Sequence, residues 1–389
     1  MSGMSSMAVV LNGEVEDVTR DGSSGDFIIE VIEMDYKAWD GNGGHPHLQT
    51  VLFKVSRQVM TQNPCSDQFK GRFTNPNSNR TSIDKDTVVG VRLWLRIIHG
   101  TITPDLYQLS VEDLWNALGF GQRWEFHLEK MQGWYDTWFG QSFGSGRSLD
   151  YDDLREHLFP SYALNRYRQF AMVTRKLSYL GRGHIEEHNP THYRHLHVPA
   201  RVIDQINAAK GSMRSRLNEA LLDCARPKTF CPQQCSKNAE SLRTYLDGVS
   251  ATCIWPFSTQ HRVAIQTIID SPGLVNWTYT KVIGACITCE RHLRGHHVTK
   301  AKERIEDYWN GLCLDCMNNS KTKTGSIHED YWLHNSLHQW SKGCRLAGHS
   351  RNTWYHSFMG RHEVMEDYLE KQRNRENNNQ QSSHSNGDS

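Results

Sequence analysis

The spacing of hydrophobic positions changes along the first third of the chain. Two segments are rich in Ile, Val and Phe and are therefore predicted to be strands: DFIIEVIEM (26–34) and TVLFKV (50–55). The spacing then lengthens to that of a helix, which Thr87 caps and Gly100 ends. The apolar residues on one face of this helix are Val88, Val91, Leu95 and Ile98.

Further patterns predict two more helices and a break between them. One helix starts at Ser110, because Asp113 three residues later completes a capping-box pattern. A Gly/Ser-rich stretch, GQSFGSGRS (140–148), predicts a flexible linker. A long amphipathic helix follows Pro199, and its apolar seam is short enough to favour a core helix over a dimerising coiled coil. The seam consists of Val202, Ile206, Ala209, Met213, Leu217 and Ala220.

These patterns predict an α+β protein with two folded domains. The first combines short strands with a helical cluster, and the second is mainly α-helical and rich in Cys and His. Both ends of the chain are predicted to be disordered, the C-terminal one because it is polar and low in complexity. The predicted boundaries are 1–24 for the disordered N-terminus, 25–139 for the first domain, 140–150 for the linker, 151–365 for the second domain and 366–389 for the tail.

Composition narrows the class of protein. The 44 Lys and Arg nearly cancel the 43 Asp and Glu, so net charge does not attract the chain to nucleic acid or to a membrane. We find neither a secretory signal nor an apolar run long enough to span a bilayer. We therefore expect an intracellular protein, nuclear or cytoplasmic, whose thiols stay reduced.

The cysteines carry the clearest chemistry. Two C-x-x-C pairs, Cys286/Cys289 and Cys313/Cys316, are predicted to hold one structural Zn²⁺, since each such turn presents two thiolates to one ion. Redox chemistry and inert buried thiols are the alternatives. A second zinc site is predicted at Cys231, Cys235, Cys344 and His349, where Cys224 could replace one ligand, and His292 could compete at the first site.

Catalytic motifs are weak by comparison. HIEEH (184–188) has the spacing of some metallopeptidases, but Gly181, Gly183 and Pro190 around it leave too little room for the helix that this motif needs. There is no phosphate-binding glycine loop and no nucleophile in a catalytic context, so we predict that the chain is not an enzyme. The segment HSRNTWYHSFMGR mixes cations with aromatic residues, which keeps nucleic-acid binding as an alternative.

The order of elements resembles a known family. Two strands, then FKVSRQVMTQ, VVGVRLWLRIIHGTI and LSVEDLWNALGFGQRWEF, resemble the BTB/POZ domain of fungal proteins over about residues 26–139. GHIEEHNPTHYRHLHVPARVIDQINAA, GLCLDCM and CRLAGHSRNTWYHSFMGR look like the C-terminal extension of the same proteins.

This resemblance implies a BTB/POZ-like first domain that makes protein–protein contacts. It also implies homo- or hetero-oligomers and an adaptor role for a cullin ubiquitin ligase. The alternative function is a zinc-dependent, nucleic-acid-binding transcriptional regulator.

Overall fold

The computed structural model divides into two compact units, Met1–Arg166 with His188–His197, and Tyr167–Glu187 with Val198–Ser389. The chain is a mixed α+β protein, with one four-stranded sheet in the first unit. No helix among the described residues is long and apolar enough to cross a membrane. The structure describes residues 15–20, 25–38, 44–62, 67–143, 149–222, 231, 235–252, 262–293, 296–319 and 344–348.

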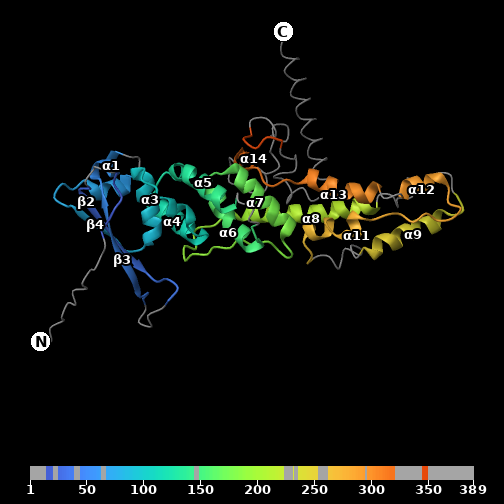
Figure 1. The fold of residues 1–389 in the computed structure, drawn as a ribbon, viewed down its shortest axis with the longest axis horizontal. Helices are drawn as coiled ribbons and strands as arrows, with labels where there is room; N and C mark the ends of the chain where they lie inside the picture. Colours follow the sequence, from blue (N-terminus) through green and yellow to red (C-terminus); the bar gives the residue numbers. More distant parts are fainter. Residues whose placement is uncertain are drawn as a thin grey trace, which may run out of the picture. The chain divides into compact units, whose positions relative to one another are not determined.

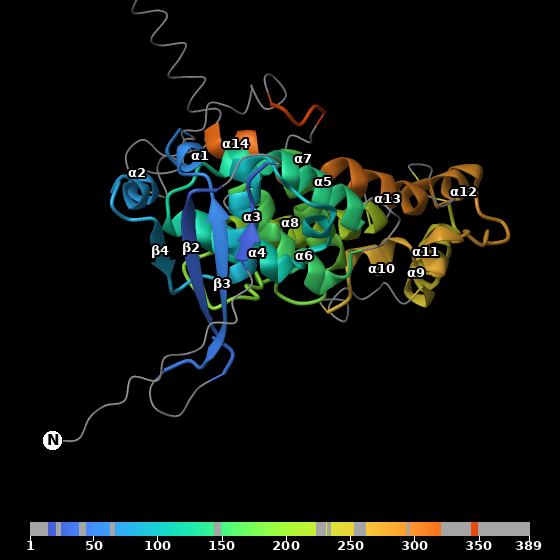
Figure 2. The ribbon, with the colours of Figure 1, turned by 60° about the vertical axis from the view of Figure 1, so that its left-hand side comes forward.

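The sheet of the first unit has the strand order β1-β3-β2-β4 (Figures 1 and 2). Strands β2 (Phe27–Met34) and β3 (His47–Val55) form an antiparallel hairpin. Strand β4 (Arg80–Ile83) pairs parallel to β2. Alternate residues of β2 are buried, as expected when a strand has one face on the core. Both predicted strands are confirmed, although β3 begins before residue 50.

The predicted disorder of residues 1–24 is wrong at one point. Strand β1 (Val15–Asp17) pairs parallel to β3, and Val18 after it is fully buried. Glu16 of this strand pairs with Arg92 and Arg96 of helix α3, at 2.8 and 3.0 Å. Three residues, two of them acidic, carry no hydrophobic alternation, so the sequence pattern gave no sign of the strand.

Helices of the first unit pack beside the sheet. The predicted caps of α3 and α4 are present: Thr87 accepts from the Gly90 N–H, Gly100 has a φ of 65°, and Ser110 and Asp113 form a capping box. The helical segments are α1 (Arg57–Gln62), α2 (Asp67–Lys70), η1 (Gly71–Phe73), α3 (Val88–His99), η2 (Pro104–Gln108), α4 (Val111–Arg123), η3 (Leu128–Met131), α5 (Gln132–Phe143) and α6 (Tyr151–Ala163).

The units divide after Arg166 and not at the predicted linker of residues 140–150. Helix α6 follows that stretch but packs against α4 of the first unit. There the Trp115 indole N–H donates to the Glu156 carbonyl at 2.8 Å. A Gly/Ser-rich sequence predicts a loop. It does not show whether the helix after the loop belongs to the preceding domain or to the following one.

His157 of α6 gives the first unit a specific pH dependence. Its ring is fully buried and stacked on Trp138, its Nδ1–H donates to the Asp153 carbonyl, and burial lowers its pKa from 6.5 to about 4. The unfolded chain therefore binds a proton more readily, and the stabilisation, complete above pH about 6.5, is lost as the pH falls towards 4.

We expect this loss to reach about 2 kcal/mol between pH 7 and pH 5. Urea unfolding of the wild type and of His157→Phe at both pH values measures it. The variant lacks the titrating ring, so its free energy of unfolding should fall by about 2 kcal/mol less than that of the wild type. Equal losses in the two proteins would assign the effect to other groups.

The described elements of the second unit are all helices. The predicted seam of α8 is buried throughout, which confirms the core-helix interpretation. Helix α8 itself packs against α7 and α13 (Figure 1). The helices are α7 (Tyr167–Leu180), α8 (Ala200–Leu222), α9 (Asn238–Ala251), α10 (Ile265–Ile269), α11 (Pro272–Val275), α12 (Ile287–Leu293), α13 (His296–Tyr308) and α14 (Leu314–Asn319).

Candidate metal centres

Four cysteines of the second unit form one cluster, which we call the first cluster: Cys231, Cys235, Cys286 and Cys289. Their sulfur atoms all lie within 4.8 Å of one another. Cys231 Sγ is 3.5 Å from Cys286 Sγ, and Cys235 Sγ is 3.6 Å from Cys289 Sγ. A disulfide requires about 2.05 Å, so these are free thiols.

Local structure fixes the position of each thiol. Cys286 immediately precedes α12, and its sulfur accepts the Cys289 backbone N–H at 3.4 Å. The C-x-x-C turn therefore forms the beginning of a helix. Cys235 lies just before α9, which packs against α12. Cys231 is buried at a φ of 32°, a region that residues other than glycine rarely adopt.

The second cluster repeats this arrangement with Cys313, Cys316 and Cys344. Cys313 immediately precedes α14, and Cys316 lies in its first turn. The sulfur atoms of Cys316 and Cys344 are 3.7 Å apart. Arg345 holds the Cys344 segment in place, because its guanidinium and backbone N–H both donate to the Asp315 carboxylate at 2.7 to 3.2 Å.

Helix α7 supports the loop that leads into the second cluster. The Tyr179 hydroxyl donates to the Trp309 carbonyl at 3.1 Å, and the Leu312 N–H donates to Thr174 Oγ1 at 2.9 Å. Gly311 lies between them with a φ of 104°. A Cβ at this position would lie 2.0 Å from the Ala171 carbonyl oxygen, so only glycine fits.

Electrostatics favour one thiolate in the first cluster unless a cation is present. The Cys289 backbone N–H stabilises the Cys286 thiolate and lowers the pKa of Cys286 to about 6. Burial raises the pKa of Cys289. In the second cluster, the hydrogen bond with Cys313 and burial raise the pKa of Cys316, and burial raises that of Cys344. A bound divalent cation would neutralise the crowded thiolates and so favour the deprotonated form of every cysteine in the cluster.

The geometry of both clusters suits a tetrahedral metal ion. With Zn–S bonds of about 2.3 Å, two sulfur ligands of one zinc ion lie about 3.8 Å apart. The observed separations of 3.5, 3.6 and 3.7 Å approach this value. Sulfur-only ligation also favours zinc over the oxygen-preferring Mg²⁺ and Ca²⁺. The donor set therefore fits a structural metal, and the first cluster supplies all four ligands.

No family model, curated protein or solved structure matches this chain. Inferences about function therefore rest on this chain's own sequence and geometry.

The structure corrects the predicted combination of cysteines. Seven of the eight predicted ligands lie in a cluster, but Cys286/Cys289 meets Cys231/Cys235, while Cys313/Cys316 meets Cys344. His292 belongs to neither group. His349 and Cys224 lie outside the described residues.

Helix α13 is the physical reason for the correction. Its 13 residues occupy more than half of the 23-residue interval between the two C-x-x-C pairs. A straight helix of this length holds its ends about 18 Å apart, so pairs at opposite ends do not meet. The observed combination also closes shorter loops than one joining Cys235 to Cys344, which costs less chain entropy.

The residues that support the clusters had weak sequence signals. Gly311 comes two residues before Cys313, and Arg345 follows Cys344. Either could have been marked as a neighbour of a ligand, but the partners Ala171 and Asp315 could not be assigned without the fold. The HIEEH segment forms no helix, and the Glu187 carboxylate accepts the Val198 backbone N–H.

Proposed function

We propose that this chain is a non-enzymatic protein–protein interaction protein of BTB/POZ type, whose second unit is stabilised by two structural zinc ions. The first cluster carries the structural-zinc part of this proposal. Four thiols in contact distance leave no position for a substrate or a bound water, which a catalytic zinc requires. Such a site stabilises a fold and does not perform a reaction.

The first unit supports the interaction role. The BTB/POZ resemblance rests on two strands, a helical segment and two later helices. The first unit has these elements in that order, as the β2–β3 hairpin, α1 and the buried helices α3 and α4, with strand β4 between α1 and α3. Oligomerisation through this unit, an adaptor role for a cullin ubiquitin ligase and a nuclear or cytoplasmic location belong to the same proposal.

Zinc per chain in double variants tests both the metal and its ligand sets. Elemental analysis of protein purified without added metal should give two zinc ions for the wild type. Cys235→Ser with Cys289→Ser removes two ligands of the same cluster and should leave one zinc. Cys289→Ser with Cys316→Ser damages both clusters and should leave none.

The opposite result is no zinc in the Cys235/Cys289 double variant and one zinc in the Cys289/Cys316 double variant. It would show that the two C-x-x-C pairs share one ion, as their spacing predicted. Absence of zinc from folded wild-type protein would overturn the metal proposal. The sequence analysis placed His349 in the same site as Cys344, so we propose His349 as the fourth ligand of the second cluster. His349→Ala should weaken zinc retention at the second cluster and leave the first cluster loaded.

The interaction role has its own test. Sedimentation of the wild-type chain over a hundredfold range of concentration should show self-association, and a cullin N-terminal domain should shift the sedimentation boundary. A chain that stays monomeric and binds no cullin would contradict the BTB/POZ part of the proposal. The zinc analysis would stand regardless.

A further inference from the structure

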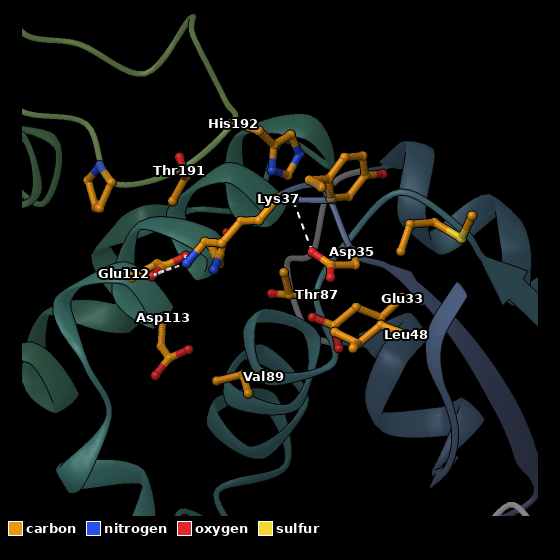
Figure 3. Close-up of a pocket in the computed structure, with 14 residues that line it drawn as sticks. Glu33, Asp35, Lys37, Leu48, Thr87, Val89, Glu112, Asp113, Thr191 and His192 are labelled. Carbon is orange, nitrogen blue, oxygen red and sulfur yellow. Dashed lines mark hydrogen bonds and ion pairs between the residues drawn. The ribbon is translucent and has the colours of Figure 1, made fainter. Parts of the chain in front are cut away.

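The first unit contains an acidic pocket of about 510 Å³ (Figure 3). It lies where the turn after β2 meets the first turns of α3 and α4 and the segment 190–192. Its size exceeds that of a single side chain and suits several residues of a bound peptide. The lining residues are Glu33, Met34, Asp35, Tyr36, Lys37, Leu48, Thr87, Val89, Glu112, Asp113, Asn116, Pro190, Thr191 and His192.

The charge of this pocket favours a cation. Its lining contains four carboxylates and one ammonium group, a formal charge of −3 with His192 neutral. Burial lowers the pKa of His192 to about 4, which keeps it neutral. The N-termini of α3 and α4 each contribute about +0.5, which still leaves a net charge of about −2.

The carboxylates differ in how far the protein already satisfies them. Glu33 accepts from the Gln49 side chain at 2.5 Å and from the Val88 N–H at 3.2 Å, and Asp113 is engaged in the capping box of α4. Glu112 is instead paired with Lys37 at 2.6 Å. The Lys37 side chain is 75% exposed and reaches across the pocket to Glu112, as Figure 3 shows.

Asn116 is a second, independent sign of a ligand. Its residue is only 8% exposed and it lines the pocket from α4. Its carboxamide makes no hydrogen bond to another described residue. Because no described residue engages this carboxamide, its oxygen can accept a hydrogen bond from a donor bound in the pocket.

The walls suit the aliphatic part of a basic side chain. Tyr36 and His192 stack with ring centroids 3.8 Å apart, and Leu48, which is 55% exposed, also lines the pocket. Aromatic faces attract cations, and apolar side chains pack against methylene groups. Acidic, aromatic and apolar surfaces thus occur together in one cavity.

The geometry points to a binding site for a basic segment of a partner protein, in which an Arg or Lys side chain displaces Lys37 from Glu112 and donates to Asn116. Lys37 therefore acts as an internal competitor for the pocket. This inference rests on the proposed interaction function and names the chemistry of the partner.

A degenerate nonapeptide library with one fixed central residue tests the site. The library is applied at low salt to the immobilised, zinc-loaded 389-residue chain. Peptides with central Arg or Lys should be retained over those with Glu or with citrulline, the neutral isostere of Arg. Fluorescence polarisation with the best retained peptide then measures affinity. Glu112→Gln should weaken binding about tenfold, and Asn116→Leu by a similar factor.

Two further variants make the test specific. Lys37→Met removes the competitor and should tighten binding about threefold or more, without unfolding the protein, because an exposed ion pair contributes about 0–1 kcal/mol. Glu129→Gln, an exposed acidic residue outside the pocket, should leave binding unchanged. A loss of affinity with Lys37→Met would overturn the competitor role.

The remaining outcomes decide whether the site exists and which ligand it binds. Equal retention of Arg, citrulline and Glu peptides would overturn the site. If agmatine binds as tightly as the best peptide, the ligand of the pocket is a small amine and not a partner protein. Zinc content and self-association of the same samples report on the proposed function, so intact values with no enrichment of basic peptides would overturn this inference alone.

Discussion

Removal of zinc is expected to unfold the second unit while the first unit keeps its fold. A structural zinc ion contributes an apparent free energy of about 10–16 kcal/mol, which equals or exceeds the about 5–15 kcal/mol stability of a typical domain. The helices beside the first cluster are also short: α12 has seven residues and α9 has 14. Isolated helices of this length are marginal in water.

Hydrogen exchange measured by mass spectrometry checks this expectation segment by segment. After chelation, amides of α9, α12 and α14 should exchange at rates of unfolded chain, while those of α3 and α4 stay protected. Adding Zn²⁺ back should restore protection, and adding Mg²⁺ should not. Unchanged protection in protein shown by elemental analysis to be free of metal would mean that the thiols pack without an ion.

Gly311→Ala is expected to destabilise the second unit by at least about 3 kcal/mol. The new Cβ would lie 2.0 Å from the carbonyl oxygen of Ala171, which belongs to the backbone of α7 and cannot rotate away. The φ of 104° at this position adds strain for any residue with a side chain. Relief requires the loop before Cys313 to move off α7, which would separate the ligands of the second cluster.

Two measurements check this prediction together. Urea unfolding should show the loss of stability, and zinc content should fall from two ions per chain towards one. Gly211→Ala is the matched control in the same unit, because a Cβ there meets no atom within 4 Å. In the middle of α8 that change should stabilise by about 0.5–1 kcal/mol. Similar effects of the two variants would show that Gly311 does not need its close approach to α7.

Local sequence patterns predicted those elements that depend only on residues close together in the sequence. The caps Thr87 and Ser110 and the seam of α8 depend on spacings of three or four residues, and the structure has all of them. The C-x-x-C pairs are local in the same sense, so the sequence identified these cysteines as candidate ligands. Which pairs meet depends on the course of the chain over more than 50 residues, here set by α13.

Other features had no local sign at all. Strand β1 is ordered by pairing with β3. A charged three-residue segment gives no sequence signal that it pairs with a strand elsewhere in the chain. Asn116 lies on the buried side of the amphipathic helix α4. In the sequence, such a single polar residue looks like the edge of the apolar stripe. Its meaning depends on Glu112 and Lys37, which the fold brings beside it.

The order in which the clusters close has a consequence for synthesis of the chain. The last ligand of the first cluster is Cys289, and the second cluster begins only at Cys313. Translation proceeds from the N-terminus, and segments fold as they emerge from the ribosome. In the proposed two-zinc protein, the first ion can thus be captured by a nascent chain that has no competing thiols from the second cluster. Vectorial synthesis separates two chemically similar sites in time and disfavours mispaired ligation.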